Sequence, residues 1–484
     1  MSFFDVERWN GKLFTGSWVD TGKYLPSTEP ATGKELATVG MAGGDELATS
    51  SQAAAAAGRA WSSRTHEERA EVLRRAADLL HTHADEFRVW LQRESGKVRV
   101  AAELELSLAE EEIRQAVTLT AQPWGQLLQT NRPGRLSIAR RVPLGVVAVI
   151  APWNFPLNLA MRSVAPALAC GNAVVLKPAS ETVVCCGVAI ARLFEEAGLP
   201  AGTLHMLPGK GSELGTSFAD DPNVDMLSFT GSTPVGKDLS EAAGRNLIRM
   251  VAELGGNNPF VVLDDADVEQ AAQAGAYGSF THQGQICMAI GRHLVAESIA
   301  DQYVDALVSL ADGLTVGDPT DDVDLGPIIN QDQVDHIDDI VQRTVKAGAQ
   351  VRAGASNDGL FVRPTVLAGV RPDMAAFAEE IFGPVAPVTT FSDDEEAIQL
   401  ANATPYGLVA AVHSRSVLRA RSVGERLEVG MVHVNDQTVN DEVVAPFGGR
   451  GESGTGAFGT LTNLDEFTRW QWMTVHDHQT NPAA

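Results

Sequence analysis

The segment from Val146 to residue 252 alternates apolar strands with helices, and this pattern restricts the fold more than any other feature. Residues 146–151 read VVAVIA, as expected for a strand that is buried on both faces of a parallel sheet. Residues 204–215 and 226–236 each read as a strand, a glycine-rich turn and the start of a helix. The sequence therefore predicts an α/β chain with a doubly wound domain.

Composition limits the kinds of partner that the chain can have. Its 484 residues, 44% of them hydrophobic, allow two or three domains with large cores. No apolar run approaches the length of a membrane span, the first residues lack a signal core, and four cysteines make no disulfide framework. A net charge of −25 disfavours nucleic acid and anionic membranes. We expect a cytoplasmic protein with a small-molecule partner.

A carboxylate and a cysteine bracket the stretch from Glu253 to Cys287. Cys287 follows the turn at Gly284, where backbone N–H groups would favour a thiolate, and Glu253 precedes two glycines, where it could activate water. A lone cysteine is more often a small buried hydrophobe, which fits Cys170, Cys185 and Cys186, and a lone glutamate is more often a solvated turn residue. The glycines and polar residues around Cys287 favour a nucleophile.

Three polar side chains follow predicted strands in the doubly wound segment. Asn154 lies in PWNFP, where its amide could donate two hydrogen bonds, although an asparagine there could also cap a helix. Lys177 ends a strand at the edge where open α/β sheets receive ligands. Ser232 precedes a helix that begins near Thr233 and could offer its N–H groups to a pyrophosphate, though such a turn is often only a turn.

Five motifs occur in one order along the chain, and together they resemble the aldehyde dehydrogenase superfamily. They are PWNFP at 152–156, FTGSTPVG at 229–236, ELGG at 253–256, GQICMA at 284–289 and EEIFGPV at 379–385. The resemblance implies the fold of that family, with a Rossmann-like cofactor domain, an α/β catalytic domain and a small β oligomerisation arm. We expect these at residues 1–123 with 144–252, at 253–463, and at 124–143 with 464–484 respectively.

The same resemblance implies roles for individual residues. Cys287 would be the nucleophile, Glu253 the hydrolytic base and Asn154 an oxyanion donor, in an oxidation of aldehydes with NAD or NADP and without a metal. The expected cofactor-binding residues are Trp153, Lys177, Ser180, Gly231, Ser232, Gly236, Glu380 and Phe382. Members that prefer NAD often carry Glu at the position of Ser180, so we expect NADP to be tolerated unless Glu181 substitutes.

Finer motifs resemble the benzaldehyde and vanillin dehydrogenases. They include ELGGNNPF with Asn257, FTHQGQICMAIGRHLV with His282, and VNDQTVNDE. Ile286, Met288 and Phe447 would line the pocket of an aromatic aldehyde. Arg162 could reach a ring substituent, but a salt bridge to a neighbouring carboxylate is an equal alternative.

Several alternatives remain open. They are a broad-specificity or semialdehyde dehydrogenase, a dehydrogenase that acylates coenzyme A, and a catalytically silent relative, although Glu253 weighs against acylation of coenzyme A. GTGAFG lacks the distal glutamate that some relatives use to relay the proton of the base. By resemblance the strands at 135–145 and 470–476 would pair across subunits in a homodimer or homotetramer.

Overall fold

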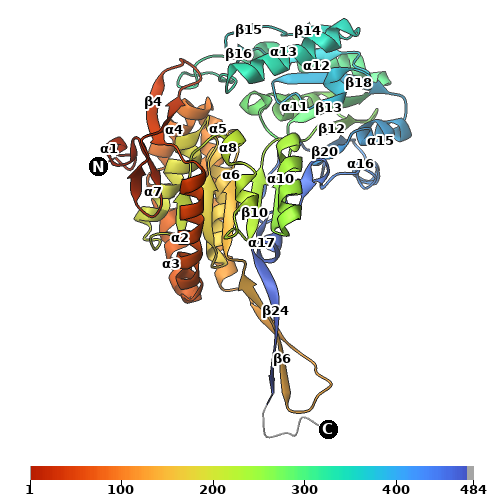
Figure 1. The fold of residues 1–484 in the computed structure, drawn as a ribbon. Helices are drawn as coiled ribbons and strands as arrows, with labels where there is room; N and C mark the ends of the chain where they lie inside the picture. Colours follow the sequence, from red (N-terminus) through yellow and green to blue (C-terminus); the bar gives the residue numbers. More distant parts are fainter. Residues whose placement is uncertain (1, 477–484) are drawn as a thin grey trace.

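The computed structural model describes residues 2–476 of the chain, and it contains two large sheets and a projecting arm (Figure 1). The first sheet has five parallel central strands, and an antiparallel strand pairs with each end of this parallel set. Its strands, in spatial order, are β2 (Trp18–Asp20), β1 (Lys12–Phe14), β9 (Leu204–Met206), β8 (Ala173–Lys177), β7 (Val146–Ile150), β10 (Met226–Thr230), β11 (Arg249–Glu253) and β23 (Gly454–Thr455). The predicted doubly wound segment supplies all five parallel strands.

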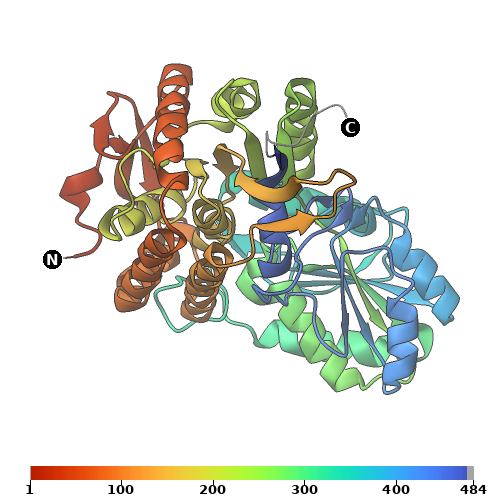
Figure 2. The same ribbon diagram turned by 90° about the horizontal axis from the view of Figure 1, so that it is seen from below.

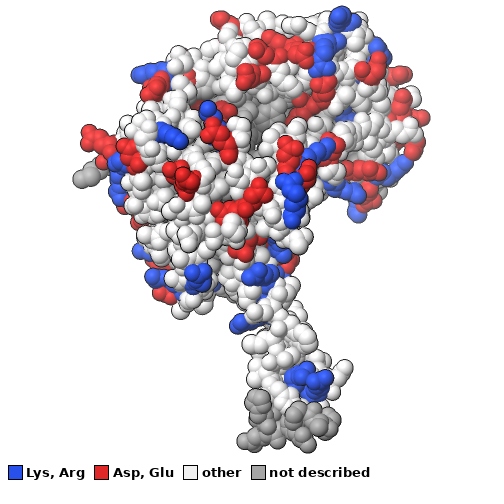
Figure 3. Space-filling view, in the orientation of Figure 1, with Lys and Arg blue, Asp and Glu red and all other residues white. Residues whose placement is uncertain are grey.

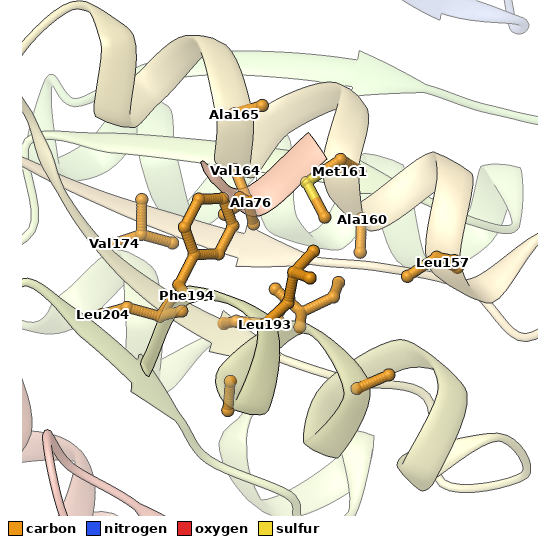
Figure 4. Packing of buried hydrophobic residues seen from close by; sticks show 14 of the residues in the cluster. Ala76, Leu157, Ala160, Met161, Val164, Ala165, Val174, Leu193, Phe194 and Leu204 are labelled. Atoms are coloured by element: carbon orange, nitrogen blue, oxygen red, sulfur yellow. The ribbon is translucent and has the colours of Figure 1, made fainter. Parts of the chain in front are cut away.

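Helices cover both faces of the first sheet and bury its apolar strands. They are α2 (Gly44–Ser62), α3 (His66–Thr82), α4 (Ala84–Ser95), α5 (Arg99–Thr120), α6 (Pro156–Ala169), the π-helical turn η1 (Val184–Val188), α7 (Ala189–Glu196) and α10 (Thr233–Asn246). Met161 and Val164 on α6 pack with Phe194 on α7 and Val174 on β8 (Figure 4). Each such side chain contributes about 1.5–3 kcal/mol by leaving water, so the start of α6 rests on a rigid base.

The second sheet comes from residues after Glu253 and is also parallel except at one edge. Its strands, in spatial order, are β14 (Gln350–Ala353), β17 (Thr365–Ala368), β18 (Val385–Phe391), β13 (Ile290–Ala296), β12 (Asn258–Val262), β20 (Val409–His413) and β21 (Met431–Val434). The longer helices from this part of the chain are α11 (Val268–Phe280), α12 (Ala300–Gly313), α13 (Gln331–Lys346), α15 (Asp394–Asn402) and α16 (Val417–Gly424). This gives a second α/β layer structure beside the first (Figures 1 and 2).

The arm is a three-stranded antiparallel sheet that extends away from both α/β parts (Figure 1). It consists of β5 (Gly125–Leu128), β6 (Arg135–Pro143) and β24 (Thr468–His476). β6 and β24 pair from Pro143↔Thr468 to Arg135↔His476. The alternation expected around residue 135 and the strand expected near residue 470 are therefore two halves of one ribbon.

The chain returns to the first sheet before it enters the arm. Gly454 and Thr455 pair antiparallel with Glu253 and Ala252 of β11, so this short strand within residues 253–463 belongs to the first sheet. Backbone pairing at the open edge of β11 draws this short strand in, which the motif boundaries did not indicate. The remaining short elements are α1 (Val6–Trp9), β3 (Tyr24–Thr28), β4 (Glu35–Gly40), α8 (Gly211–Leu214), α9 (Ser217–Asp220), η2 (Thr281–Gly284), η3 (Glu297–Ile299), β15 (Asn357–Asp358), β16 (Phe361–Val362), α14 (Ala375–Ala378), β19 (Tyr406–Gly407), β22 (Arg450–Gly451) and α17 (Thr460–Glu466).

The carboxyl ends of the parallel strands meet at one edge of the first sheet. Ile150 is opposite both Phe229 and Lys177, and Thr230 is opposite Glu253. The loops that follow β7, β10 and β11 therefore start side by side, at the edge where open α/β sheets bind ligands. Among the described residues, none of the helices combines the length and hydropathy that a membrane span requires.

Candidate active site

A strained turn presents Cys287. His282, Gln283 and Gly284 all have left-handed φ values, of 49°, 57° and 68°. A side chain at Gly284 would collide with the carbonyl oxygen of Gly383, so this position requires glycine. Left-handed non-glycine residues cost about 1–3 kcal/mol each, and persist where the surroundings hold them.

Two buried amide side chains hold this turn through hydrogen bonds to neighbouring loops. The Gln283 amide donates to the carbonyl oxygens of Gly96 and Pro327, at 3.1 and 2.8 Å. The Gln285 side-chain oxygen accepts from the backbone N–H of Ile329 at 3.0 Å. Both glutamines are fully buried. These bonds offset the strain and set the direction in which the following residues, including Cys287, leave the turn.

Cys287 lies between two cavities. One cavity, of about 470 Å³, is also lined by Glu253, Glu380 and the loops after β7 and β10. The other, of about 250 Å³, is lined mainly by apolar side chains and by Arg162. Cys287 and Asn154 line both cavities. The surface is hollowed between the two α/β parts, with acidic side chains on its rim (Figure 3).

The surroundings of Cys287 favour the neutral thiol. Burial, and next the carboxyl groups of Glu253 and Glu380, together raise the pKa of Cys287 to about 12, although Arg162 partly opposes the rise. Our expectation that the turn favours a thiolate is therefore wrong for the protein without ligands. Burial is the largest cause of this rise, and the two carboxyl groups add to it from other segments of the chain.

Glu253 is buried beside the same cavity. It ends β11, and its carbonyl oxygen accepts from the N–H of Gly231 at 3.0 Å. Both of its carboxyl oxygens are buried without a hydrogen-bond partner. Burial raises the pKa of Glu253 well above its usual value, and Arg162 partly opposes this. A carboxyl group that is buried, unpaired and directed into a cavity is typical of a catalytic acid or base.

Asn154 is held at the other side of Cys287. Its side-chain amide donates to the carbonyl oxygen of Gln285 at 2.9 Å, which leaves the second N–H of that amide uncommitted. The alternative role as a helix cap is wrong, because Phe155 occupies the N-cap of α6 and the first N–H groups of α6 are bonded by Glu105. Asn154 can therefore donate to an oxyanion on a group attached to Cys287.

The larger cavity has features that fit a dinucleotide. Ser232 caps α10 without a side-chain bond and lines the cavity, so N–H groups of the helix start are available to phosphates. Trp153 and Phe382 line it as an edge-to-face pair, with ring centroids 5.5 Å apart. Gly231 also lines it, where a side chain would collide with the ring of Phe229.

Three other expected cofactor residues, Lys177, Ser180 and Gly236, do not line this cavity, although Lys177 is opposite Ile150 at the same edge of the sheet. Burial lowers the pKa of Lys177, whose ammonium has one 3.3 Å bond to the carbonyl of Pro178. Ser180 is partly exposed just beyond it. Gly236 lets α10 pack directly on Leu254, which lines the cavity. A buried cation with a single backbone partner at a strand end fits a ribose or phosphate ligand.

Glu380 is the second buried carboxyl group of the larger cavity. It accepts a hydrogen bond from the N–H of Gly256 at 2.9 Å. Burial raises the pKa of Glu380 to about 7, and this hydrogen bond opposes the rise. Glu380 can therefore accept from a hydroxyl group of a bound ligand at neutral pH.

The smaller cavity has an apolar wall and a buried ionic cluster. Ile286, Met288 and Phe447 are 3–7% exposed and pack with Phe155 and Leu159. The Arg162 guanidinium lies 4.6 Å from the centroid of the Phe447 ring. It forms ion pairs with Glu112, at 2.9 Å, and with Asp441. Of the two roles considered for Arg162, the structure shows the salt bridge.

Comparison with known proteins identifies the family. Residues 18–473 match the model of the aldehyde dehydrogenase family. The chain belongs to the aldehyde dehydrogenase family. Enzymes of this family use NAD or NADP as the oxidant, which agrees with the features of the larger cavity.

Named relatives of this aldehyde dehydrogenase match almost its whole length. A vanillin dehydrogenase from Amycolatopsis sp. is 52% identical, and a benzaldehyde dehydrogenase [NAD(+)] from Pseudomonas putida is 46% identical, each over 98% of both chains. A solved salicylaldehyde dehydrogenase from Pseudomonas putida G7, in complex with salicylaldehyde, has a TM-score of 0.93 and 32% identity. That match covers 98% of this chain and 99% of the solved one.

Several residues of the site in this aldehyde dehydrogenase carry no recognisable signal in the sequence. Gln333, His336 and Tyr406 line the larger cavity, and Lys97 and Glu105 form a buried ion pair beneath Asn154. A lysine and a glutamate on Ala-rich helical segments look like a solvated face, so the pattern carried no signal for the pair. Within residues 2–476, no group of three or more His, Cys, Asp or Glu is placed to hold a metal ion.

Proposed function

We propose that this aldehyde dehydrogenase oxidises aromatic aldehydes, of the benzaldehyde or vanillin type, to carboxylic acids. The observation that carries this proposal is the apolar cavity of about 250 Å³ on one side of Cys287, walled by Ile286, Met288 and Phe447. A ring of benzaldehyde size would bury its surface there while its carbonyl carbon approaches the sulfur. The names of the vanillin and benzaldehyde dehydrogenase relatives support the same substrate class.

In this proposal the side chains around Cys287 divide the reaction between them. The Cys287 sulfur bonds to the aldehyde carbon, and the Asn154 amide stabilises the oxygen anion of the thiohemiacetal. NAD or NADP, which Ser232, Trp153 and Glu380 would hold in the larger cavity, would supply the acceptor for the hydride that leaves the thiohemiacetal carbon as the thioester forms on Cys287. Glu253 then takes a proton from water, which attacks the thioester carbon and releases the acid and the Cys287 thiol.

The buried carboxyl groups explain how an unfavourable thiol pKa is compatible with this chemistry. Because burial raises the pKa of both Glu253 and Glu380, each has a neutral fraction that does not repel a thiolate. Glu253 in its carboxylate form can take the thiol proton as the sulfur bonds to carbon. We infer that one group can serve as the base in both halves of the reaction.

The proposal is tested by measuring the oxidation of a panel of aldehydes through the absorbance of the reduced nicotinamide. Benzaldehyde, vanillin, salicylaldehyde and an aliphatic aldehyde are each assayed with NAD and with NADP. We expect the highest kcat/KM for the aromatic aldehydes. The Cys287→Ser variant should oxidise none of the aldehydes. A clear preference for the aliphatic or a semialdehyde substrate would contradict the proposal, and an acyl product that forms only with coenzyme A would favour the acylating alternative.

We also propose that the arm joins copies of this chain into a homodimer or homotetramer. Leu127, Trp470 and Trp472 expose 74%, 51% and 69% of their surface on a sheet with two open edges. The arm strands and their connecting turn carry arginines and no acidic residue, while the whole chain has a net charge of −25; the arginines are Arg132, Arg135, Arg140, Arg141 and Arg469. A second copy of this acidic chain would cover the exposed apolar side chains and offer carboxylates to the arginines. A cytoplasmic location is the corresponding proposal for compartment.

A further inference from the structure

One buried ammonium group connects the two loops that carry Asn154 and Cys287. Lys97 is fully buried, and its Nζ donates to the backbone oxygen of Asn154. The same Nζ lies 2.9 Å from Nε2 of His282 and 3.3 Å from a carboxyl oxygen of Glu105. It also lies 3.8 Å from the centroid of the Phe155 ring. Lys97 lines neither cavity beside Cys287, so it acts only through these neighbours.

The ion pair holds the end of the β7–α6 loop that enters α6, together with the first turn of α6. Lys97 binds the carbonyl oxygen of Asn154, and Glu105 accepts from the N–H groups of Leu157 and Asn158 at 2.8 and 3.2 Å. Burial lowers the pKa of Lys97 to about 8, with Glu105 opposing, so the ammonium form still predominates at neutral pH. A buried pair adds little stability compared with apolar residues of the same shape, so stability alone does not account for it.

His282 extends this connection to the loop of the nucleophile. It is the first of the three left-handed residues before Cys287, and its Nε2 lies 2.9 Å from the backbone oxygen of Asn154. The Asn154 amide in turn donates to the carbonyl of Gln285, two residues before Cys287. The distance from sulfur to amide is therefore set by a closed ring of contacts through Lys97, His282 and Gln285.

We propose that Lys97 is a positioning residue, which with Glu105 and His282 holds the Asn154 amide at the distance from Cys287 that stabilises the oxyanion. The proposal rests on the proposed oxidation of aldehydes, since it assigns Asn154 its oxyanion role. A misplacement of about 1 Å can cost roughly 100-fold in rate, and an oxyanion donor contributes about 100- to 1000-fold. Lys97 therefore affects the rate without touching substrate or cofactor.

A double-mutant cycle tests the proposal. Lys97→Met should lower kcat by about 10- to 100-fold with little change in KM or in the affinity for NADP. In an Asn154→Ala background the same change should cost less than about twofold, because the donor that Lys97 positions is already absent. Equal losses in both backgrounds would show that Lys97 has only a general structural role, and would overturn the proposal.

Two further variants separate positioning from folding. His282→Phe keeps the Lys97–Glu105 pair and should still lower kcat, by about 3- to 10-fold; an unchanged kcat would contradict the role of His282. Arg69→Met removes another buried cation, which binds the backbone oxygens of Ala169 and Arg64 away from the site. It should lower the unfolding temperature and leave kcat within about twofold.

A crystal structure of Lys97→Met gives a readout that does not depend on turnover. We expect the Asn154 amide to move by more than about 0.5 Å and to lose its bond to Gln285, since catalytic groups need support at about that precision. An amide that stays in place would overturn the inference even if the enzyme is active. The two proposals can also fail separately. If the natural enzyme oxidises no aldehyde, the proposed function is rejected; if the amide of Asn154 is nevertheless displaced in Lys97→Met, Lys97 still positions Asn154.

Discussion

At the scale of single residues, the two unpaired oxygens of Glu253 give the sharpest prediction about the reaction. Glu253→Gln cannot take a proton from water, so hydrolysis of the thioester should slow by about 100-fold or more. The first turnover should slow as well, because Glu253 takes the thiol proton there, but by less than hydrolysis since solvent can accept that proton; a burst of about one reduced cofactor per site should therefore remain. Rapid-mixing absorbance measures both phases. Glu241→Gln, an exposed carboxylate paired with Arg245 on α10, is the control and should change neither phase.

The pH dependence of hydrolysis follows from the same residue. Burial raises the pKa of Glu253, so its carboxylate is populated only as the pH rises through that raised value. The rate of the hydrolytic phase should therefore increase with pH in the natural enzyme. In Glu253→Gln the dependence should vanish, and a rate that falls with rising pH would contradict a base role for Glu253.

Ser180 gives a second prediction at this scale, on the choice of cofactor. Ser180 itself carries no carboxylate to repel the 2′-phosphate of NADP, so we expect kcat/KM for NAD to exceed that for NADP by less than about 1000-fold, or ~4 kcal/mol. Ser180→Glu should lower kcat/KM for NADP by about tenfold or more and leave NAD little changed. The control is Ser180→Gln, which introduces a side chain of the same size as glutamate without its charge. It should not change the ratio of kcat/KM for NAD to that for NADP. A larger preference for NAD in the natural enzyme would show that Glu181 already supplies the charge.

The side chains proposed to react could be selected from the sequence, but their ionisation could not. Cys287, Glu253 and Asn154 could be selected because glycines and prolines mark the turns that carry them. The direction of the Cys287 pKa could not, because it depends on Glu380, more than ninety residues away, and on burial by several segments. The salt bridges of Arg162 could not be predicted for the same reason, because its two partners come from α5 and from the loop before Phe447.

At the scale of elements, Arg162 joins α5, α6 and the loop at Asp441, and its loss should destabilise their junction. Arg162→Met leaves Glu112 and Asp441 without their cation, which should cost about 3–5 kcal/mol of unfolding free energy. Denaturant unfolding measures the loss. Adding Glu112→Gln and Asp441→Asn should recover most of it, because no unpaired charge then remains. An unchanged unfolding midpoint in Arg162→Met would contradict this account.

The sign of the pH effect is set by Glu112. Burial raises the pKa of Glu112 to about 7 in the natural enzyme, and Arg162 opposes that rise, so without Arg162 the pKa should be higher still. A folded state that holds a proton more tightly than the unfolded state loses stability as pH rises. The stability of Arg162→Met should therefore fall through neutral pH towards alkaline pH.

Since both carboxylates already hold the guanidinium, we also expect the loss of Arg162 to raise KM similarly for benzaldehyde and for hydroxylated benzaldehydes.

Elements with a strong local pattern were predictable, and elements that depend on a distant partner were not. The five parallel strands of the first sheet follow from short apolar runs between glycine turns. The strand β23 has two residues, one of them glycine, and exists only because β11 offers an open edge. The cap of α6 likewise comes from Glu105 on α5 and not from Asn154, and no local pattern could indicate that.

At the scale of the whole molecule, the proposed role of the arm is to join copies of the chain. Its exposed tryptophans are also tied to the arm itself, because Trp470 stacks under Arg141 and Trp472 donates to Ser137 at 2.9 Å. They are therefore presented rigidly, which lowers the entropy cost of binding a second copy. A three-stranded sheet with two open edges and no core of its own has little stability alone, so a partner would stabilise the arm.

The corresponding prediction concerns Trp470→Ser with Trp472→Ser. Buried tryptophans at interfaces often contribute about 2 kcal/mol or more each, so the pair should weaken association by about 1000-fold and convert a dimer or tetramer into a smaller species. Analytical ultracentrifugation over a range of concentrations measures this. Leu418→Ser removes a side chain that is 80% exposed on α16, far along the chain from the arm, and should leave the mass unchanged. Since both cavities beside Cys287 are lined only by residues outside the arm strands, the monomeric variant should keep its kcat, and a natural enzyme that is already monomeric would reject the role of the arm.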